Sequence, residues 1–288
     1  MNDTHERETW RRETELLHLA DTSCEWDGAV NPPVVHVSLF CFESLQEYLD
    51  TIDGKIAHYT YGRSGNPTTR VLEQKIAFLE KAEDALALAS GMAAITTALL
   101  TFVRAGDHIL VVSCVYGPVR TFCDTTLRRL GVETEYFPSS ESLNIAQRIR
   151  PNTRLIYVES PGSLTFDIQD LRAIARAARE RGVLTMIDNT WATPLYQNPI
   201  ELGIDLVIHS GTKYIAGHSD LMLGLIVGPH ELMKPVRAMA RLLGGALSPD
   251  DAYLAIRGLR TLPVRMARHQ ESGLRVARWL QGRPEVRK

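Results

Sequence analysis

Short apolar segments recur along the chain between residues 85 and 227, separated by polar and glycine-containing segments. Each apolar segment is too short for an average helix and is bounded by turn-forming residues, which is typical of strands buried in a sheet. The pattern predicts seven strands, at residues 85–89, 108–112, 134–137, 155–158, 183–187, 206–208 and 223–227.

Segments with helical spacing of apolar residues lie between those strands. This spacing predicts helices at 93–103, 119–130 and 167–181, the last with Asp170 as candidate N-cap and Gly182 as its stop. Alternating strands and helices predict an α/β fold with a mostly parallel seven-stranded sheet covered by helices on both faces. In such sheets ligands bind at the carboxyl ends of the strands.

The two ends of the chain follow different patterns. Near the N-terminus single apolar residues alternate with polar ones, and Asn31-Pro32-Pro33 interrupts any helix, so we expect an arm that packs on another subunit. A glycine-rich turn then leads into a helix that begins at Asn66-Pro67. The predicted division is an N-terminal arm at 1–63, an α/β domain that holds the ligand at 64–258, and the start of a further domain at 259–288.

Composition and charge narrow the class of function. The 32 Lys and Arg residues against 34 Asp and Glu give a net charge of -2, which offers no electrostatic reason to expect nucleic acid or an anionic membrane as a partner. The charged start of the chain is unlike a signal peptide, and no segment approaches the ~18 apolar residues of a membrane-spanning helix. The cysteines lack metal-ligand spacing, so we expect no metal site. We expect buried free thiols at Cys24, Cys41, Cys114 and Cys123, which fits a reducing, cytoplasmic location.

The segment DLVIHSGTKY, residues 205–214, ends a predicted strand in small polar residues and a lysine. We expect Lys213 to lie in a low-dielectric pocket, where desolvation favours the neutral amine, and a neutral amine can attack a carbonyl group. Ser210 and Thr212 place two hydroxyl groups beside it, which suits an anionic group such as a phosphate. On this segment alone, a surface lysine after a strand is an equally good interpretation.

Three other predicted strands end in residues with complementary chemistry. Gly91 and Met92 open a helix after the first strand, where free backbone N–H groups bind phosphate, although tight packing explains a glycine there just as well. Tyr116 follows the second strand and is either available to stack on a flat ring or an ordinary half-buried residue. Asp188 ends an otherwise apolar strand, and a buried carboxylate there needs a cationic or proton-donating partner.

Together these strand ends predict a site for pyridoxal 5'-phosphate. The aldehyde of this cofactor forms a Schiff base with a lysine, its ring nitrogen pairs with an aspartate, and its phosphate takes N–H and hydroxyl donors. Lys213, Asp188 and the strand-end donors match these three requirements. An ordinary dinucleotide-binding α/β protein fits less well, because no GxGxxG follows the first strand.

Several spaced motifs resemble the Cys/Met-metabolism (transsulfuration) family of enzymes that depend on pyridoxal phosphate and have the aspartate-aminotransferase-like fold, PLP fold type I. The matching segments run from about Pro32 to the C-terminus and are YGRSGNPTTRVLE, SGMAA, DNTWATPL, SGTKYIAGHSD and RGLRTLPVR. The resemblance implies that Lys213 is the Schiff-base lysine, that Asp188 pairs with the pyridinium nitrogen, and that Tyr116 stacks on the ring and assists proton transfer. The phosphate would be held by Gly91, Met92, Ser210 and Thr212.

The same resemblance implies an oligomer. Tyr61 and Arg63 would reach the phosphate bound to the neighbouring subunit, which makes a dimer the minimum unit and a homotetramer, a dimer of dimers, the expected assembly. The substrate would be a sulfur-containing amino acid.

Within the family, ESPGS at 159–163 and GHSD at 217–220 look most like bacterial cystathionine β-lyase, whereas γ-acting relatives more often carry Asn a few residues after the Ser-Pro. This implies β-elimination of L-cystathionine to homocysteine, pyruvate and ammonia, as in methionine biosynthesis. Lys213 would remove the Cα proton, and Lys213 or Tyr116 would supply the proton to the leaving thiolate. Because few residues decide substrate choice, a γ-acting relative stays an alternative, such as cystathionine γ-lyase, cystathionine γ-synthase or methionine γ-lyase.

The chain ends at Arg287-Lys288, shortly after a helix that the spacing predicts at 264–280. In the family about 100 further residues follow, a typical size for a small domain, and they include the arginine that binds the substrate α-carboxylate. The resemblance therefore implies a chain truncated at its C-terminus. Such a chain is either a fragment of a longer enzyme or a cofactor-binding chain without turnover.

Overall fold

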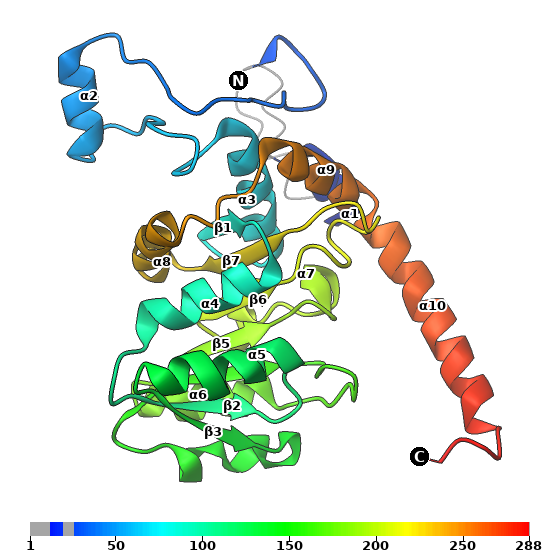
Figure 1. Ribbon diagram of the computed structural model, residues 1–288. Helices are drawn as coiled ribbons and strands as arrows, with labels where there is room; N and C mark the ends of the chain where they lie inside the picture. The colour runs from blue at the N-terminus through cyan, green and yellow to red at the C-terminus, as the bar shows by residue number, and fades with distance from the viewer. Residues whose placement is uncertain (1–11, 20–25, 288) are drawn as a thin grey trace.

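A seven-stranded sheet forms the centre of the computed structural model, which describes residues 12–19 and 26–287 (Figure 1). The order of strands in the sheet is β1-β7-β6-β5-β4-β2-β3, and within these described ranges only β7 runs antiparallel to its neighbours. The predicted mostly parallel sheet is therefore confirmed, with strand boundaries within two residues of the expected ones. The strands are β1 Asp84–Leu88, β2 His108–Val112, β3 Glu133–Phe137, β4 Thr153–Glu159, β5 Leu184–Asp188, β6 Leu206–His209 and β7 Gly224–Gly228.

Helices cover the sheet on both faces, and for this reason every residue of β2, β6 and β7 is buried. The helix α4 packs against α5, α8 and β7, whereas α6 packs on β5 and α3 packs on β1 and α9. The helices are α1 Arg12–His18, α2 Leu45–Ile52, α3 Pro67–Leu79, α4 Gly91–Phe102, α5 Gly117–Phe122, α6 Leu171–Glu180, α7 Thr193–Tyr196, α8 His230–Leu243, α9 Pro249–Arg260 and α10 Leu262–Gln281, with a π-helical segment at Cys123–Leu127 and 3-10 segments at Ser139–Arg148 and Ile200–Leu202.

Helix starts follow the capping residues of the sequence. The side chain of Asn66 accepts a hydrogen bond from the Thr68 N–H at 2.9 Å, and Asp170 caps α6 in the same way, as predicted. Gly182, at φ +64°, follows α6 in a left-handed conformation that glycine adopts without strain. The helix expected at 119–130 begins two residues early, at Gly117, because Pro118 suits the first helical turn.

The helices α2 and α10 lie away from the sheet (Figure 1). No residue of α2 is buried, and its Leu45 side chain is 73% exposed. Along α10 the buried residues are Leu262 and Met266, both in its first two turns. The division into an arm, an α/β domain and the start of a further domain stays a prediction.

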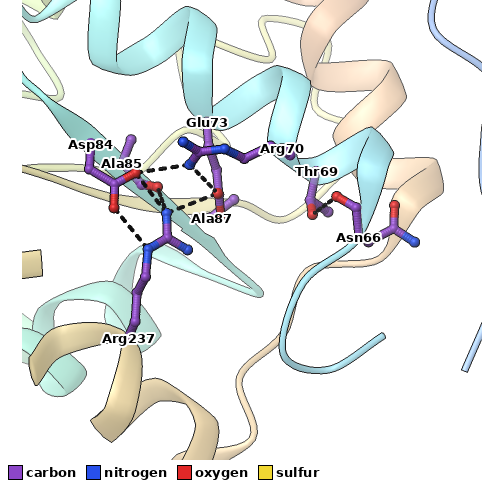
Figure 2. Close-up of polar contacts among 8 residues, drawn as sticks. All are labelled: Asn66, Thr69, Arg70, Glu73, Asp84, Ala85, Ala87 and Arg237. Atoms are coloured by element: carbon purple, nitrogen blue, oxygen red, sulfur yellow. Dashed lines mark hydrogen bonds and ion pairs between the residues drawn. The ribbon is translucent and has the colours of Figure 1, made fainter. Parts of the chain in front are cut away.

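A network of ion pairs joins α3, β1 and α8 at one end of the sheet (Figure 2). Arg237 donates from Nε to Asp84 Oδ2 at 2.9 Å and from Nη2 to Glu73 Oε2 at 3.0 Å. Arg70 donates to Asp84 Oδ1 at 2.9 Å, and Glu73 accepts the backbone N–H of Ala87 at 3.0 Å. Each of the two buried carboxylates therefore has a cationic partner, and α8 is fastened to the edge strand.

The cysteines only partly match the expectation of buried thiols. Cys123 is buried in the core, Cys114 is half-buried, and Cys41 is exposed because it lies on the N-terminal arm outside the sheet. Cys24 lies outside the described residues. No helix in the described parts of the chain is both long and apolar enough to cross a membrane, and these parts contain no cluster of three or more His, Cys, Asp or Glu placed to hold a metal ion.

Candidate active site

Seven of the nine predicted site residues lie at the side of the sheet where the parallel strands end. Because β7 alone is reversed among the described strands, the carboxyl ends of the other six strands lie at the same edge. Asp188 is the last residue of β5, and the remaining residues follow β1, β2 and β6 directly. The fold thus brings together Gly91, Met92, Tyr116, Asp188, Ser210, Thr212 and Lys213.

The start of α4 lies against the turn after β6. Ser90 caps this helix by accepting the Ala93 N–H at 3.1 Å. A Cβ atom on Gly91 would lie 2.9 Å from both Cβ and Oγ of Ser210, so only glycine permits this approach. The first N–H groups of α4 and the Ser210 hydroxyl therefore form a narrow cradle whose donors suit a phosphate group.

Thr212 holds the turn beside this cradle. Its hydroxyl accepts the Leu223 N–H at 2.9 Å and donates to the Leu223 carbonyl oxygen at 3.2 Å. These bonds tie the turn after β6 to the segment that enters β7. Binding of phosphate by Thr212 and Met92 stays a prediction.

Asp188 is a buried carboxyl group, with 6% of its surface exposed. It accepts the N–H of Thr190 at 2.9 Å, and burial raises its pKa above the ordinary value. No Arg or Lys of the described chain pairs with it, which contrasts with the carboxylates of the α3–β1–α8 network. A cationic ring nitrogen at this position would supply the missing partner, so Asp188 and the glycine cradle both fit pyridoxal phosphate.

Glu159 and Thr190 were not identified as site residues from the sequence. Glu159 ends β4 in register with Asp188 and is 4% exposed, and burial together with the charge of Asp188 raises its pKa to about 8. The Thr190 hydroxyl accepts the Ser210 N–H at 2.7 Å, so Thr190 links Asp188 to the turn after β6. The sequence does contain a signal for both residues, because Glu159 stands at a strand end and Thr190 lies two residues after Asp188. It does not show which strands pair, so it could not place these residues beside Asp188 and Ser210.

Tyr116 stands at the start of α5 with 46% of its surface exposed. Its backbone N–H donates to Glu159 Oε2 at 2.7 Å. The ring is therefore accessible at the edge where the strands end. Stacking of this ring on a cofactor stays a prediction.

The expected burial of Lys213 is not observed. Its side chain is exposed, because residues 211–216 form a series of turns that carry the chain out of the sheet after β6. The Lys213 N–H donates to the Ser210 carbonyl oxygen at 3.0 Å, which fixes the backbone of the lysine beside the cradle. The amino group is thus accessible at the same edge as Asp188, although it is not in a low-dielectric pocket.

A buried polar network fixes the carboxyl ends of β5 and β6. His209 Nε2 lies 2.6 Å from Glu80 Oε1, and the side-chain amide of Asn189 donates to the same oxygen at 2.8 Å. Gln197 in turn donates to Asn189 Oδ1 at 2.8 Å. Because Asn189 directly follows Asp188 and His209 ends β6, the network restricts the position of both strand ends.

Tyr61 and Arg63 lie elsewhere in the chain, at the β1 edge of the sheet beside α8. The guanidinium of Arg63 donates to the carbonyl oxygen of Arg241 in α8 and lies 5.6 Å from the centre of the Tyr61 ring. Tyr61 is 41% exposed. The structure therefore does not bring these two residues among the strand ends, and their reach into a neighbouring subunit stays a prediction.

Comparisons with known proteins agree with this geometry. The family model for Cys/Met metabolism PLP-dependent enzymes matches residues 13–288. The putative cystathionine beta-lyase of Rhizobium johnstonii is 44% identical over 273 residues, which cover 95% of this chain and 68% of that protein. The L-methionine gamma-lyase of Fusobacterium nucleatum is 38% identical, with 91% of this chain and 67% of that protein covered.

The solved structure of metB from Corynebacterium glutamicum has the same fold, with a TM-score of 0.91 and 35% identity over 98% of this chain and 71% of that one. The aspartate-aminotransferase-like fold predicted from the sequence is therefore confirmed, and the chain spans about 70% of the length of these relatives. The sheet, the strand-end site and the matched family agree: the chain belongs to the Cys/Met metabolism PLP-dependent enzymes, whose cofactor is pyridoxal 5'-phosphate.

Proposed function

We propose that this chain carries the site of a carbon–sulfur lyase that converts L-cystathionine to homocysteine, pyruvate and ammonia by β-elimination. The observation that carries the proposal is the meeting of Lys213, Asp188 and the Gly91–Ser210 cradle at one edge of the sheet. The relative from Rhizobium johnstonii, named a putative cystathionine beta-lyase, supports the choice of reaction. When bound, pyridoxal phosphate supplies an electron sink for the carbanion that proton removal creates.

Each residue of the site has a separate task. Gly91 and Ser210 bind the phosphate and set the depth of binding, while the carboxylate of Asp188 keeps a proton on the ring nitrogen. The amino group of Lys213 would attach the cofactor and would accept the Cα proton of the substrate. Tyr116 would stack on the cofactor ring, and its hydroxyl or the Lys213 ammonium would donate a proton to the departing thiolate sulfur.

A γ-elimination or γ-replacement reaction is the second candidate. The relative from Fusobacterium nucleatum is named an L-methionine gamma-lyase. Its 38% identity equals that of the cystathionine beta-lyase MetC of Bacillus subtilis. The same residues would serve either reaction, because both begin with removal of the Cα proton. Products separate the two, since β-elimination of cystathionine yields pyruvate and γ-elimination yields 2-oxobutyrate.

We also propose that the protein acts as a homo-oligomer in the cytoplasm. The exposed helix α2, with Tyr61 and Arg63 beside α8, supports the oligomer, because this region leaves a cation available to a second subunit. The measurement is the molar mass of the protein in solution by light scattering, with the Arg63→Ala variant as comparison. A monomer that binds the cofactor fully would contradict this part of the proposal.

The decisive experiment adds pyridoxal phosphate to the purified chain and records the visible spectrum before and after borohydride reduction. A band that reduction traps on Lys213, identified by peptide mapping, supports the site. L-cystathionine is then added, and pyruvate and 2-oxobutyrate are measured separately. A cofactor that binds without either product would indicate a cofactor-binding chain without turnover, and the absence of binding would contradict the proposed site.

A further inference from the structure

Glu159 is a buried carboxyl group at the site, and the proposed reaction gives it no role. It ends β4, the strand next to β5, and its 4% exposure makes it nearly as inaccessible as the core residues around it. Carboxyl groups are rarely buried to this extent unless they are paired or bound to N–H groups. The contacts of Glu159 therefore indicate what holds it there.

The first contact of Glu159 is with the backbone that presents Tyr116. Its Oε2 accepts the Tyr116 N–H at 2.7 Å, a short bond of the kind that N–H groups form with carboxylates. Tyr116 is the N-cap residue of α5, and no side chain caps this helix from within. Glu159 thus supplies the acceptor that the helix start lacks and fixes the residue whose ring lies at the site.

The second neighbour of Glu159 is Asp188. The two residues are paired in the register of the parallel strands β4 and β5, so their side chains lie on the same face of the sheet. The charge of Asp188 adds to burial in raising the pKa of Glu159 to about 8. The side chain of Glu159 therefore contacts the backbone of Tyr116 and interacts electrostatically with Asp188.

We propose that Glu159 is a positioning residue for pyridoxal phosphate, acting through the Tyr116 backbone on the ring face and through Asp188 on the ring nitrogen. This inference rests on the proposed assignment of Tyr116 and Asp188 to the cofactor. The two actions use different properties of the side chain. The Tyr116 bond needs an acceptor oxygen, whereas the effect on Asp188 needs a negative charge on Glu159. Without the cofactor, Glu159 keeps its proton up to about pH 8, and a cationic ring nitrogen bound beside Asp188 would favour its ionised form.

Two variants separate these actions, and a third is the matched control. Glu159→Gln keeps an acceptor oxygen and removes the charge, and Glu159→Leu removes both. The control is Asp205→Asn, at the opposite end of the same group of strands, because Asp205 accepts the Thr185 N–H at the same distance of 2.7 Å. Melting temperatures of all four cofactor-free proteins establish that each variant is folded.

The readouts are the dissociation constant for pyridoxal phosphate and the pH midpoint of its visible absorption band. We expect Glu159→Leu to weaken binding roughly tenfold, as for loss of a hydrogen bond to a charged group. We expect Glu159→Gln to bind within about threefold of wild type. Its pH midpoint should fall by about one unit, because the variant lacks the negative charge with which ionised Glu159 would stabilise the protonated cofactor. Asp205→Asn changes neither readout.

The outcomes that overturn the inference are distinct from failure of the proposed function. If the wild-type protein does not bind pyridoxal phosphate, the proposed function and this inference both fail. If it binds, but the two Glu159 variants match it in affinity and pH midpoint, the inference alone fails. If Glu159→Leu and Asp205→Asn weakened cofactor binding equally, Glu159 would have only a general structural role, and the inference would fail as well.

Discussion

Two pairs of buried carboxyl groups in the described chain have opposite surroundings. Asp84 and Glu73, where α3 and β1 meet α8, share the guanidinium groups of Arg237 and Arg70 (Figure 2). Glu159 and Asp188, at the carboxyl ends of β4 and β5, have backbone N–H donors but no arginine or lysine partner in the described chain. Both pairs are buried to a similar extent.

The pKa values follow this difference. Burial alone would raise the pKa of Asp84, but the hydrogen bonds from Arg237 and Arg70 outweigh it and hold the pKa below its usual value. Burial raises the pKa of Asp188, and burial with the charge of Asp188 raises that of Glu159 to about 8. Arginine holds the first pair in its ionised form, whereas burial opposes ionisation of the second pair until a cationic ligand binds beside it. Buried carboxyl groups without an arginine or lysine partner are therefore the feature that distinguishes the proposed site from the α3–β1–α8 network.

The largest effect is expected at Lys213. We expect Lys213→Ala to abolish covalent attachment of the cofactor and to lower turnover by at least about 10³-fold, because the amine is both the attachment point and the base. Since the side chain is exposed, stability in urea changes by no more than about 0.5 kcal/mol. Product assays and urea unfolding measure the two quantities. Full turnover by the variant would contradict the assignment of the site.

The two carboxyl pairs give opposite dependences of stability on pH. The raised pKa of Glu159 means that the folded chain holds a proton that the unfolded chain releases above pH 4.5, so stability falls as pH rises from 4.5 to about 8. At about 1.4 kcal/mol per pKa unit, the loss is at most about 5 kcal/mol. The lowered pKa of Asp84 acts conversely, and its stabilisation is lost as pH falls below 3.8.

Urea unfolding of the cofactor-free protein at several pH values tests this dependence. Glu159→Gln removes the titrating group, so the difference in unfolding free energy between variant and wild type should grow between pH 4.5 and 8. Parallel pH profiles for the two proteins would contradict the predicted pKa of Glu159.

Removal of Arg237 should leave the carboxylates of Asp84 and Glu73 only partly paired with positive charge. The side chain is one quarter exposed, and Arg237→Leu leaves Asp84 and Glu73 with Arg70 alone, so we expect a loss of about 3 kcal/mol in the free energy of unfolding. Lys234→Leu, an exposed site one turn earlier on α8, is the control and should change stability by less than about 0.5 kcal/mol. Equal effects of the two substitutions would show that the network contributes little.

The smallest effect is expected at Arg70, which is 37% exposed and therefore partly screened by solvent. We expect Arg70→Ala to cost about 1 kcal/mol, because Arg237 still donates hydrogen bonds to both carboxylates. In the Arg237→Leu background the same change should cost more, since it removes the last cation of the network. A double-mutant cycle measures this coupling, and strict additivity would mean that the two arginines act independently.

Much of the fold could be predicted from local pattern. The seven strands were located within two residues, because each is a short apolar run between turn residues, and the Asn66 and Asp170 caps were identified because capping uses residues adjacent in sequence. Lys213, Asp188 and Tyr116 were assigned to one edge for a similar reason, since parallel strands place their ends together. The burial of Lys213 was wrong, because the turns after β6 carry it outwards.

The sequence by itself determined the succession of strands and helices along the chain, the helix caps, and the chemistry of the residues that end each strand. These properties depend on apolar spacing and on neighbours within a few residues, which the sequence displays directly. Only the tertiary structure decided that Glu159 lies beside Asp188, that Thr190 joins Asp188 to Ser210, and that Arg237 reaches Asp84. The physical reason is that these contacts depend on strand register and helix packing, which bring distant residues within hydrogen-bond range.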